Sequence, residues 1–168
     1  PWFFFSEGLL TATTSFTDYS YLVKKVVFKI ELLPVVKVVS ALFFHLAFVL
    51  VVALLSAILG NYPGLHWLQL PYYGVCMIVL VLAFGTLTAS ILPFFRDLVQ
   101  LLNILLQFGM WLTPILWRAE MIPERYRWVF KLNPVGYVVE GYRDSLFGGA
   151  WFWEHWATTL GFWAVAGV

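Results

Sequence analysis

Three long stretches with almost no charge limit what this chain can fold into. Residues 35–59 carry one lysine near their start and one histidine, whereas residues 71–92 and 98–117 carry no charged side chain. A helix needs about 20 apolar residues to cross a hydrocarbon core of about 30 Å. The chain is 62% hydrophobic and 11% charged, against about 45–50% and about 25% in soluble domains. The sequence therefore predicts an all-α, polytopic membrane helix bundle.

Both ends of the chain are also apolar. Residue 1 is a proline at the start of an aromatic run, and the run that begins at Trp151 is still apolar at Val168. Neither run is preceded by a basic leader with a small-residue cleavage site. We therefore expect residues 1–168 to form a single transmembrane domain within a longer protein.

Residues 21–30 are predicted to form an amphipathic helix on the membrane surface. Leu22, Val26 and Ile30 recur at helical spacing between lysines, which is typical of a helix lying in the interface. The turn at residues 60–64 has no basic residue, so the lysine-rich side is predicted to be cytoplasmic. Charge counting alone leaves this orientation open, because residues 118–150 place a similar number of cations, offset by acids, on the opposite side.

Amide side chains form a stripe along the run at residues 98–117. Gln100, Asn103 and Gln107 lie at positions i, i+3 and i+7, and Trp111 continues the same face one turn later. Amides without partners are costly in lipid. This face is therefore predicted to meet protein or a water-filled path. Helix–helix hydrogen bonding and a translocation lining both remain open, and the two overlap at a dimer seam.

Residues 118–150 mix charges with apolar pieces that are too short to cross a membrane, which predicts interfacial or re-entrant helices. A helix over residues 137–146 would place Arg143 between the carboxylates of Glu140 and Asp144. Intramembrane ions usually pair with one another. Pairing and direct contact with a substrate phosphate are both open roles for Arg143.

Residues that could carry catalysis are scattered. There is no G-x-x-x-x-G-K-[ST] sequence for nucleotide phosphates, and at a net charge of +1 there is no basic stripe for nucleic acid. The three histidines show no metal-ligand spacing with one another or with the single Cys76. The carboxylates at depth lie in separate segments, namely Glu7, Glu140 and Glu154. Neither a metal site nor an enzyme is predicted.

Aromatic residues cluster near the predicted span ends, where amphipathic rings favour the membrane–water interface. An interfacial belt is the favoured interpretation for these side chains. They are Trp2, Trp67, Tyr72, Tyr73, Trp117, Trp151 and Trp153.

Several short motifs, in this order and spacing, resemble the ABC-2 family of export permeases. Near the N-terminal end, Pro1-Trp2-Phe3-Phe4-Phe5 and residues 22–28 look like that family's second membrane helix and the cytoplasmic coupling segment after it. The other motifs are Phe95-Arg96-Asp97-Leu98, residues 107–115, Met121-Ile122-Pro123, Leu132-Asn133-Pro134 and residues 141–145.

The resemblance implies six membrane helices per subunit, of which this chain would hold the second to the sixth. The N-terminal cytoplasmic helix, the first span and the C-terminal end would lie outside it. It also implies a homodimer bound to two ABC ATPase subunits, which would hold ATP and Mg, while this chain needs no cofactor. Coupling to the ATPase would involve Tyr21, Leu22, Lys24, Lys25, Val26 and Lys29. The re-entrant exit region would include Asn133, Pro134, Glu140, Arg143 and Asp144.

Within the family, residues 141–145, Phe152-Trp153-Glu154 and residues 159–163 look most like teichoic-acid export permeases of Gram-positive bacteria. O-antigen exporters are close relatives of these. The resemblance then implies a bacterial plasma-membrane permease that moves a lipid-linked anionic polymer among membrane lipids, with no covalent step. Alternatives are a permease for O-antigen or capsular polysaccharide, a membrane-embedded glycosyl- or phosphotransferase, and a channel or structural bundle.

Overall fold

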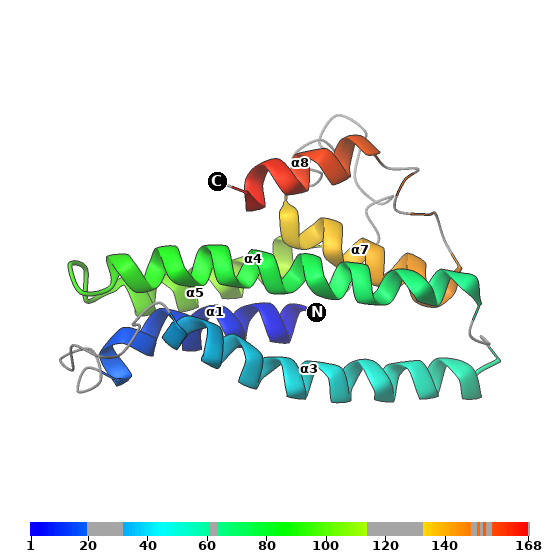
Figure 1. Cartoon of the computed structure of the whole chain (residues 1–168), viewed down its shortest axis with the longest axis horizontal. Helices are drawn as coiled ribbons and strands as arrows, with labels where there is room; N and C mark the ends of the chain where they lie inside the picture. The colour runs from blue at the N-terminus through cyan, green and yellow to red at the C-terminus, as the bar shows by residue number, and fades with distance from the viewer. Residues whose placement is uncertain are drawn as a thin grey trace.

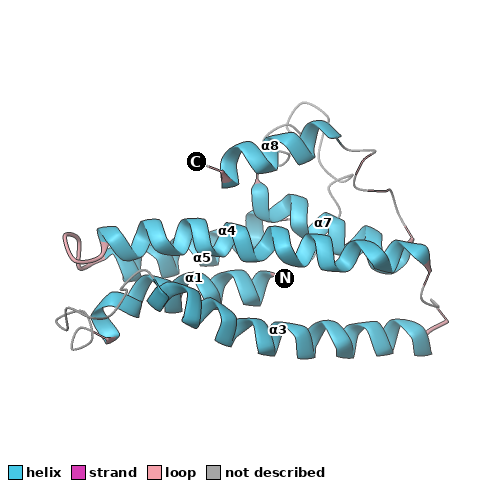
Figure 2. Ribbon diagram, viewed as in Figure 1, coloured by secondary structure: helices cyan, strands magenta, loops and turns pink. Residues whose placement is uncertain are grey.

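The computed structural model describes residues 1–19, 32–60, 64–113, 133–148, 151, 153 and 156–167. This described part is helical and contains no strand (Figure 1; Figure 2). The elements are α1 (Trp2–Asp18), α3 (Leu32–Ile58), the 3-10 helix η1 (Leu65–Gln69), α4 (Leu70–Ile91), α5 (Leu98–Leu112), α7 (Pro134–Phe147) and α8 (Trp156–Ala166). The predicted all-α helix bundle is confirmed.

Helices α3 and α4 form the long sides of the bundle. They run in opposite directions, and α1 packs against both of them (Figure 1). Helix α5 contacts α1, whereas α7 lies on α4 and η1 and carries α8 on its other side. The C-terminal end of α1, the start of α3 and the turn between α4 and α5 lie at one end of the bundle, and η1 lies at the other (Figure 1).

Two helices are long and apolar enough to cross a membrane. They cover Leu32–Ile58 and Leu65–Ile91, each 27 residues long, and at about 1.5 Å per residue each exceeds the hydrocarbon thickness of about 30 Å. They correspond to the first two runs identified in the sequence. The predicted helix over residues 137–146 is also confirmed, as part of α7.

The third predicted span is shorter than expected. The apolar run continues to residue 117, but α5 ends at Leu112 after 15 residues. Thr113 has an extended backbone, with φ −81° and ψ 132°, and it directly precedes Pro114. A proline disfavours helical ψ at the residue before it, because its Cδ clashes with that residue's backbone. The predicted C-terminal limit of this helix was therefore wrong.

Small residues bring α1 and α4 into close contact. A Cβ atom built on Gly85 of α4 would lie 2.7 Å from the Cβ of Ala12 of α1. One turn further along, the hydroxyl oxygens of Thr13 and Thr88 are 2.6 Å apart and share a hydrogen bond between the helices. Glycine and alanine at such contacts let helix backbones approach closely in a membrane, where hydrogen bonds add to the packing.

Two of the predicted interfacial aromatic residues lie inside the bundle instead. Trp2 and Tyr73 are only 8% and 3% exposed. Trp2 covers Gly109 of α5, and the Tyr73 ring lies directly against Gly141 of α7. Glycine leaves room there for an aromatic ring, so these side chains join helices. The interfacial interpretation was wrong for both.

Candidate functional site

The amide stripe of α5 faces away from the chain's own core. Gln100, Asn103 and Gln107 are all exposed, and Trp111 is 71% exposed. At about 100° per residue, these four side chains lie together on one half of the exposed surface of α5. Apolar side chains occupy the other half of that exposed surface, namely Leu101, Ile104, Leu105 and Phe108.

Asn103 shows how an amide of this stripe is satisfied within its own helix. Its Nδ2 donates a hydrogen bond to the carbonyl oxygen of Val99 at 2.9 Å. This bond lowers the cost of placing the amide in an apolar environment. Its carbonyl oxygen can still accept hydrogen bonds from water or another chain. The role of the stripe at a seam or path stays a prediction.

The start of α7 is fixed to the end of α5. The Asn133 side-chain oxygen accepts a hydrogen bond from the backbone N–H of Val135 at 3.1 Å, and its Nδ2 donates to Thr113 Oγ1, also at 3.1 Å. Pro134 occupies the first helical turn, where its missing N–H costs nothing. Asn133 and Pro134 therefore set where this short helix begins and which helix it adjoins.

The charged residues of α7 lie on its less buried side. Glu140 is exposed, while Arg143 and Asp144 are half-buried. Each of the three has an interaction partner. The predicted pairing of Arg143 with the two carboxylates stays a prediction, as does contact with a substrate.

A network of hydroxyl and aromatic groups joins α4, α7 and α8. Tyr137 Oη lies 2.9 Å from Thr159 Oγ1 and 3.4 Å from Tyr72 Oη. Trp163 Nε1 donates a hydrogen bond to Tyr72 Oη at 3.2 Å. Tyr73 stands beside this network, its ring centroid 5.5 Å from that of Tyr137. These contacts hold α7 between two other helices.

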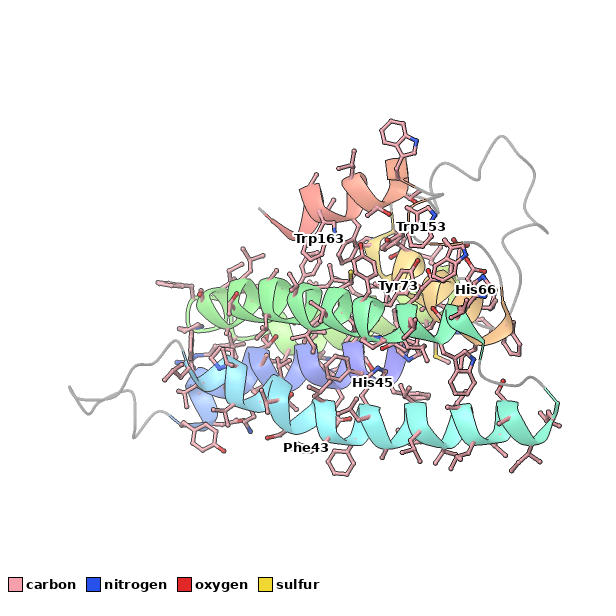
Figure 3. The ribbon with its side chains drawn as sticks, turned by 45° about the vertical axis from the view of Figure 1, so that its right-hand side comes forward. Phe43, His45, His66, Tyr73, Trp153 and Trp163 are labelled. Atoms are coloured by element: carbon pink, nitrogen blue, oxygen red, sulfur yellow. The ribbon has the colours of Figure 1, made fainter. Side chains whose placement is uncertain are left out.

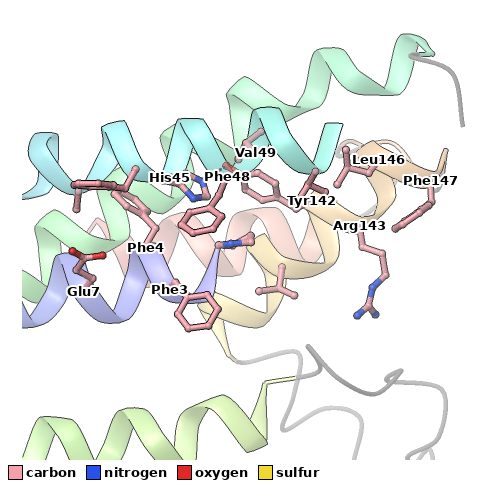
Figure 4. Close-up of a pocket in the computed structure, with 15 residues that line it drawn as sticks. Phe3, Phe4, Glu7, His45, Phe48, Val49, Tyr142, Arg143, Leu146 and Phe147 are labelled. Carbon is pink, nitrogen blue, oxygen red and sulfur yellow. Dashed lines mark hydrogen bonds between the residues drawn. The ribbon is translucent and has the colours of Figure 1, made fainter. Parts of the chain in front are cut away.

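A groove of about 500 Å³ lies between α1, α3 and α7 (Figure 4). His45 forms part of its wall, with Nε2 3.0 Å from Tyr142 Oη and the Phe4 ring stacked on the imidazole at 4.8 Å. Glu7 and Arg143 lie toward opposite ends of the groove (Figure 4). The rest of the lining is apolar, so the groove suits hydrocarbon or protein side chains. The only sign of the His45–Tyr142 contact in the sequence is a histidine inside a long apolar run.

The predicted coupling segment lies between α1 and α3 in the sequence. Tyr21, Leu22, Lys24, Lys25, Val26 and Lys29 lie outside the described residues, so their role stays a prediction. The flanking helices are tied together where they reach this segment. Lys37 Nζ of α3 is 3.5 Å from Asp18 Oδ2 of α1 and 5.0 Å from the Tyr19 ring centroid.

A second hollow opens at the same end of the bundle. It has a volume of about 400 Å³ and lies between the C-terminal part of α1 and the α4–α5 turn, which contributes Arg96. The structure thus brings Arg96 close to the C-terminal part of α1. Within the described residues there is no cluster of three or more His, Cys, Asp or Glu side chains suited to a metal ion.

Comparison with known proteins places these features in a family context. A family profile described as "ABC-2 type transporter" matches residues 1–147. An O-antigen export system permease protein RfbA of Klebsiella pneumoniae is 24% identical over 156 residues, covering 92% of this chain and 60% of the relative. A protein of the same name from Myxococcus xanthus is 26% identical over 157 residues, covering 92% and 58%. The chain therefore spans about three fifths of the length of these relatives.

Proposed function

The chain belongs to the ABC-2 type transporter family, and from this premise we propose that it forms most of the membrane-spanning part of an ATP-driven exporter. The cargo would be a lipid-linked cell-surface polymer in a bacterial plasma membrane. The observation that carries the proposal is the family match across residues 1–147. Two helices of spanning length support it.

The two ends of the bundle suit different roles in such an exporter, coupling to the ATPase at one end and closing the exit at the other. The ion pair between Lys37 and Asp18 ties α1 to α3 at the base of the coupling segment. ATPase subunits that close on ATP would therefore move both helices together. The opposite end holds η1 and the C-terminal end of α7. The packing of α7 on η1 could close the exit at that end until the bundle moves, and export would need no covalent step in this chain.

The polymer could be a teichoic-acid-like chain, as the sequence motifs suggested, or an O-antigen-like polysaccharide. Both relatives reported above are named as O-antigen export permeases, which favours a polysaccharide. The family match speaks against the alternative of a different class, a membrane-embedded transferase. A transferase would change the length or composition of the polymer rather than its location.

The exposed amide face of α5 is proposed to meet a second copy of the chain or the polymer path. Single cysteines replacing Gln100, Asn103 or Gln107, in a Cys76→Ser background, should cross-link between subunits or react with water-soluble thiol reagents. Leu101 and Leu105 are also exposed on the isolated chain and serve as matched controls. Equal behaviour of the two sets, in labelling and in cross-linking, would contradict this proposal.

Deleting the gene tests the export function directly. Cells that lack the permease should accumulate the lipid-linked polymer on the cytoplasmic side, and so should cells whose partner ATPase cannot hydrolyse ATP. Chemical analysis of the accumulated material then separates glycerol or ribitol phosphates from hexoses. Normal surface polymer in the deletion strain, or polymer of altered length at the surface, would contradict the proposal.

A further inference from the structure

The face of α1 that its neighbours leave uncovered is mostly polar. Most of the α1 residues that are not buried carry a hydroxyl or a carboxylate, namely Ser6, Glu7, Thr11, Thr14, Thr17 and Asp18. Helix α3 is different, because every exposed residue from Phe43 to Ile58 is apolar. Phe43 is 70% exposed and points away from the other helices (Figure 3). Lipid suits that face of α3, whereas the polar face of α1 needs water or hydrogen-bonding groups beside it.

The hydroxyl groups of this polar face present oxygen lone pairs rather than hydrogens. Ser6, Thr11 and Thr17 each donate their hydroxyl hydrogen to a backbone carbonyl oxygen three or four residues earlier in α1, at 2.8–3.1 Å. A hydroxyl has one hydrogen and two lone pairs, and an ionised carboxylate accepts hydrogen bonds only. The polar face therefore presents mainly acceptors, and a ligand that binds it must bring hydrogen-bond donors.

Glu7 is the deeper of the two carboxylates on this face. It precedes Asp18 by about three turns of helix, which is about 16 Å at about 1.5 Å per residue, and Asp18 pairs with Lys37 at the end of the bundle. A hydrocarbon core of about 30 Å would place Glu7 near its middle. Among the residues that the structure describes, no side chain forms an ion pair or a hydrogen bond with the Glu7 carboxylate, and Arg143 lies toward the opposite end of the groove (Figure 4). A carboxylate at this depth must reach water or a partner.

The polar face of α1 adjoins α5, whose exposed amides are proposed above to meet a second copy or the polymer path. Thr14 and Thr17 border the same hollow as Val99 of α5, which directly precedes Gln100 in the sequence. Glu7 lies two turns before Thr14 on the same side of α1. Water that fills a path beside α5 would therefore also reach Glu7.

A neutral glycan has the chemistry that this face requires. Its hydroxyl groups can donate hydrogen bonds to carboxylate and hydroxyl oxygens. A polymer with an ionised phosphate in every repeat brings acceptor oxygens and negative charge instead. Like charges repel more strongly where low-dielectric walls surround them. The charge of Glu7 therefore favours the first class of polymer over the second.

We propose that the polar face of α1 lines the polymer path, and that Glu7 accepts hydrogen bonds from the hydroxyl groups of a neutral glycan and repels a polymer of phosphate diesters. This role rests on the proposed export function and narrows the cargo to a glycan without phosphate in its repeats. The competing role for Glu7 is a hydrogen bond to another helix, which would close this face to water.

The test uses the full-length permease with its ATPase in phosphatidylcholine nanodiscs during ATP hydrolysis. Thr11→Cys, in a Cys76→Ser background, places a thiol one turn after Glu7 on the polar face. A cationic methanethiosulfonate should modify this thiol about 10-fold faster than an anionic one of similar size, because the charge of Glu7 concentrates cations. Glu7→Gln should abolish most of that difference. Phe43→Cys on α3 is the matched control, and neither reagent should modify it.

Two soluble probes then test the selectivity, with a neutral thiol reagent as the readout. A mannose hexasaccharide should slow modification of Thr11→Cys about threefold or more. An oligo(glycerol phosphate) should slow it only when Glu7→Gln is also present. The proposal is overturned if no reagent modifies Thr11→Cys, if the two charged reagents react equally fast, or if both probes protect equally with Glu7 intact. ATP hydrolysis at the rate of the Cys76→Ser parent shows that each variant is assembled.

The export function has its own readout. Charge-dependent modification and hexasaccharide protection, in a complex that transports nothing, would leave the glycan-binding face standing and remove the proposed transport. Intact export by a Thr11→Cys variant that no water-soluble reagent reaches would do the reverse.

Discussion

Gly85 is the position where one added methyl group should test the packing of α1 on α4. In Gly85→Ala, the new Cβ would lie 2.7 Å from the Cβ of Ala12, whereas carbon atoms prefer a separation of about 3.5–4.0 Å. The two helices must therefore move apart by about 1 Å. That shift would stretch the 2.6 Å hydrogen bond between Thr13 and Thr88 to about 3.6 Å, beyond useful geometry.

The expected loss of stability follows from these two effects. Overpacking of this kind costs about 1–3 kcal/mol, and an interhelical hydrogen bond in a membrane contributes about 0.6 kcal/mol, rising to about 1.7. Alanine offsets about 1 kcal/mol of this because it favours a helix more than glycine does. The net loss should be about 1–3 kcal/mol. It is measured as the shift in the free energy of unfolding during denaturation of the full-length protein in bicelles.

A second substitution makes the interpretation specific. Ala12→Gly removes the atom that Gly85→Ala would strike, so the double variant should recover at least half of the loss. Gly161→Ala in α8 is the control, because a Cβ there meets no atom within 4 Å, and it should be neutral or slightly stabilising. If Gly85→Ala leaves stability unchanged, or if Ala12→Gly fails to restore it, the close approach of α1 and α4 is wrong.

Three further outcomes follow from single contacts. His45→Phe should lower stability by about 0.6–1.7 kcal/mol because it removes the partner of Tyr142 Oη. Tyr142→Phe should cause little further loss of stability in that background. Additive losses of the two variants in a thermal denaturation series would contradict this contact. Asn133→Ala should speed hydrogen exchange in the first turn of α7 and lower the free energy of unfolding by about 1 kcal/mol, since both the cap and the bond to Thr113 are lost. Asn133→Asp should keep the cap, so equal exchange in both variants would refute the capping role. Leu22→Asp in the coupling segment should uncouple ATP hydrolysis from export, and unchanged ATPase co-purification and transport would remove that segment from the coupling mechanism.

Hydropathy alone was enough to place the membrane-crossing helices. The cost of leaving an apolar run in water depends on its composition and length, so Leu32–Ile58 and Leu65–Ile91 could be found without knowing their neighbours. The end of α5 was also readable in principle, because Pro114 disfavours a helical residue before it. Counting apolar residues alone extended the predicted helix to residue 117, past its end at Leu112. The exposed amide face of α5 followed from helical periodicity.

The tertiary structure decided which apolar surfaces lie inside the bundle. A helix in lipid is apolar all round, so composition does not distinguish the face that meets lipid from the face that meets another helix. Tyr73 and Trp2 therefore looked interfacial until the glycines opposite them were known. His45 and Tyr142 are 97 residues apart in sequence, and the ring of His66 in η1 lies 4.7 Å from that of Trp151, between centroids. Such contacts depend on how each helix is rotated and which helix it adjoins, and the spacing of residues within one helix carries no information about either.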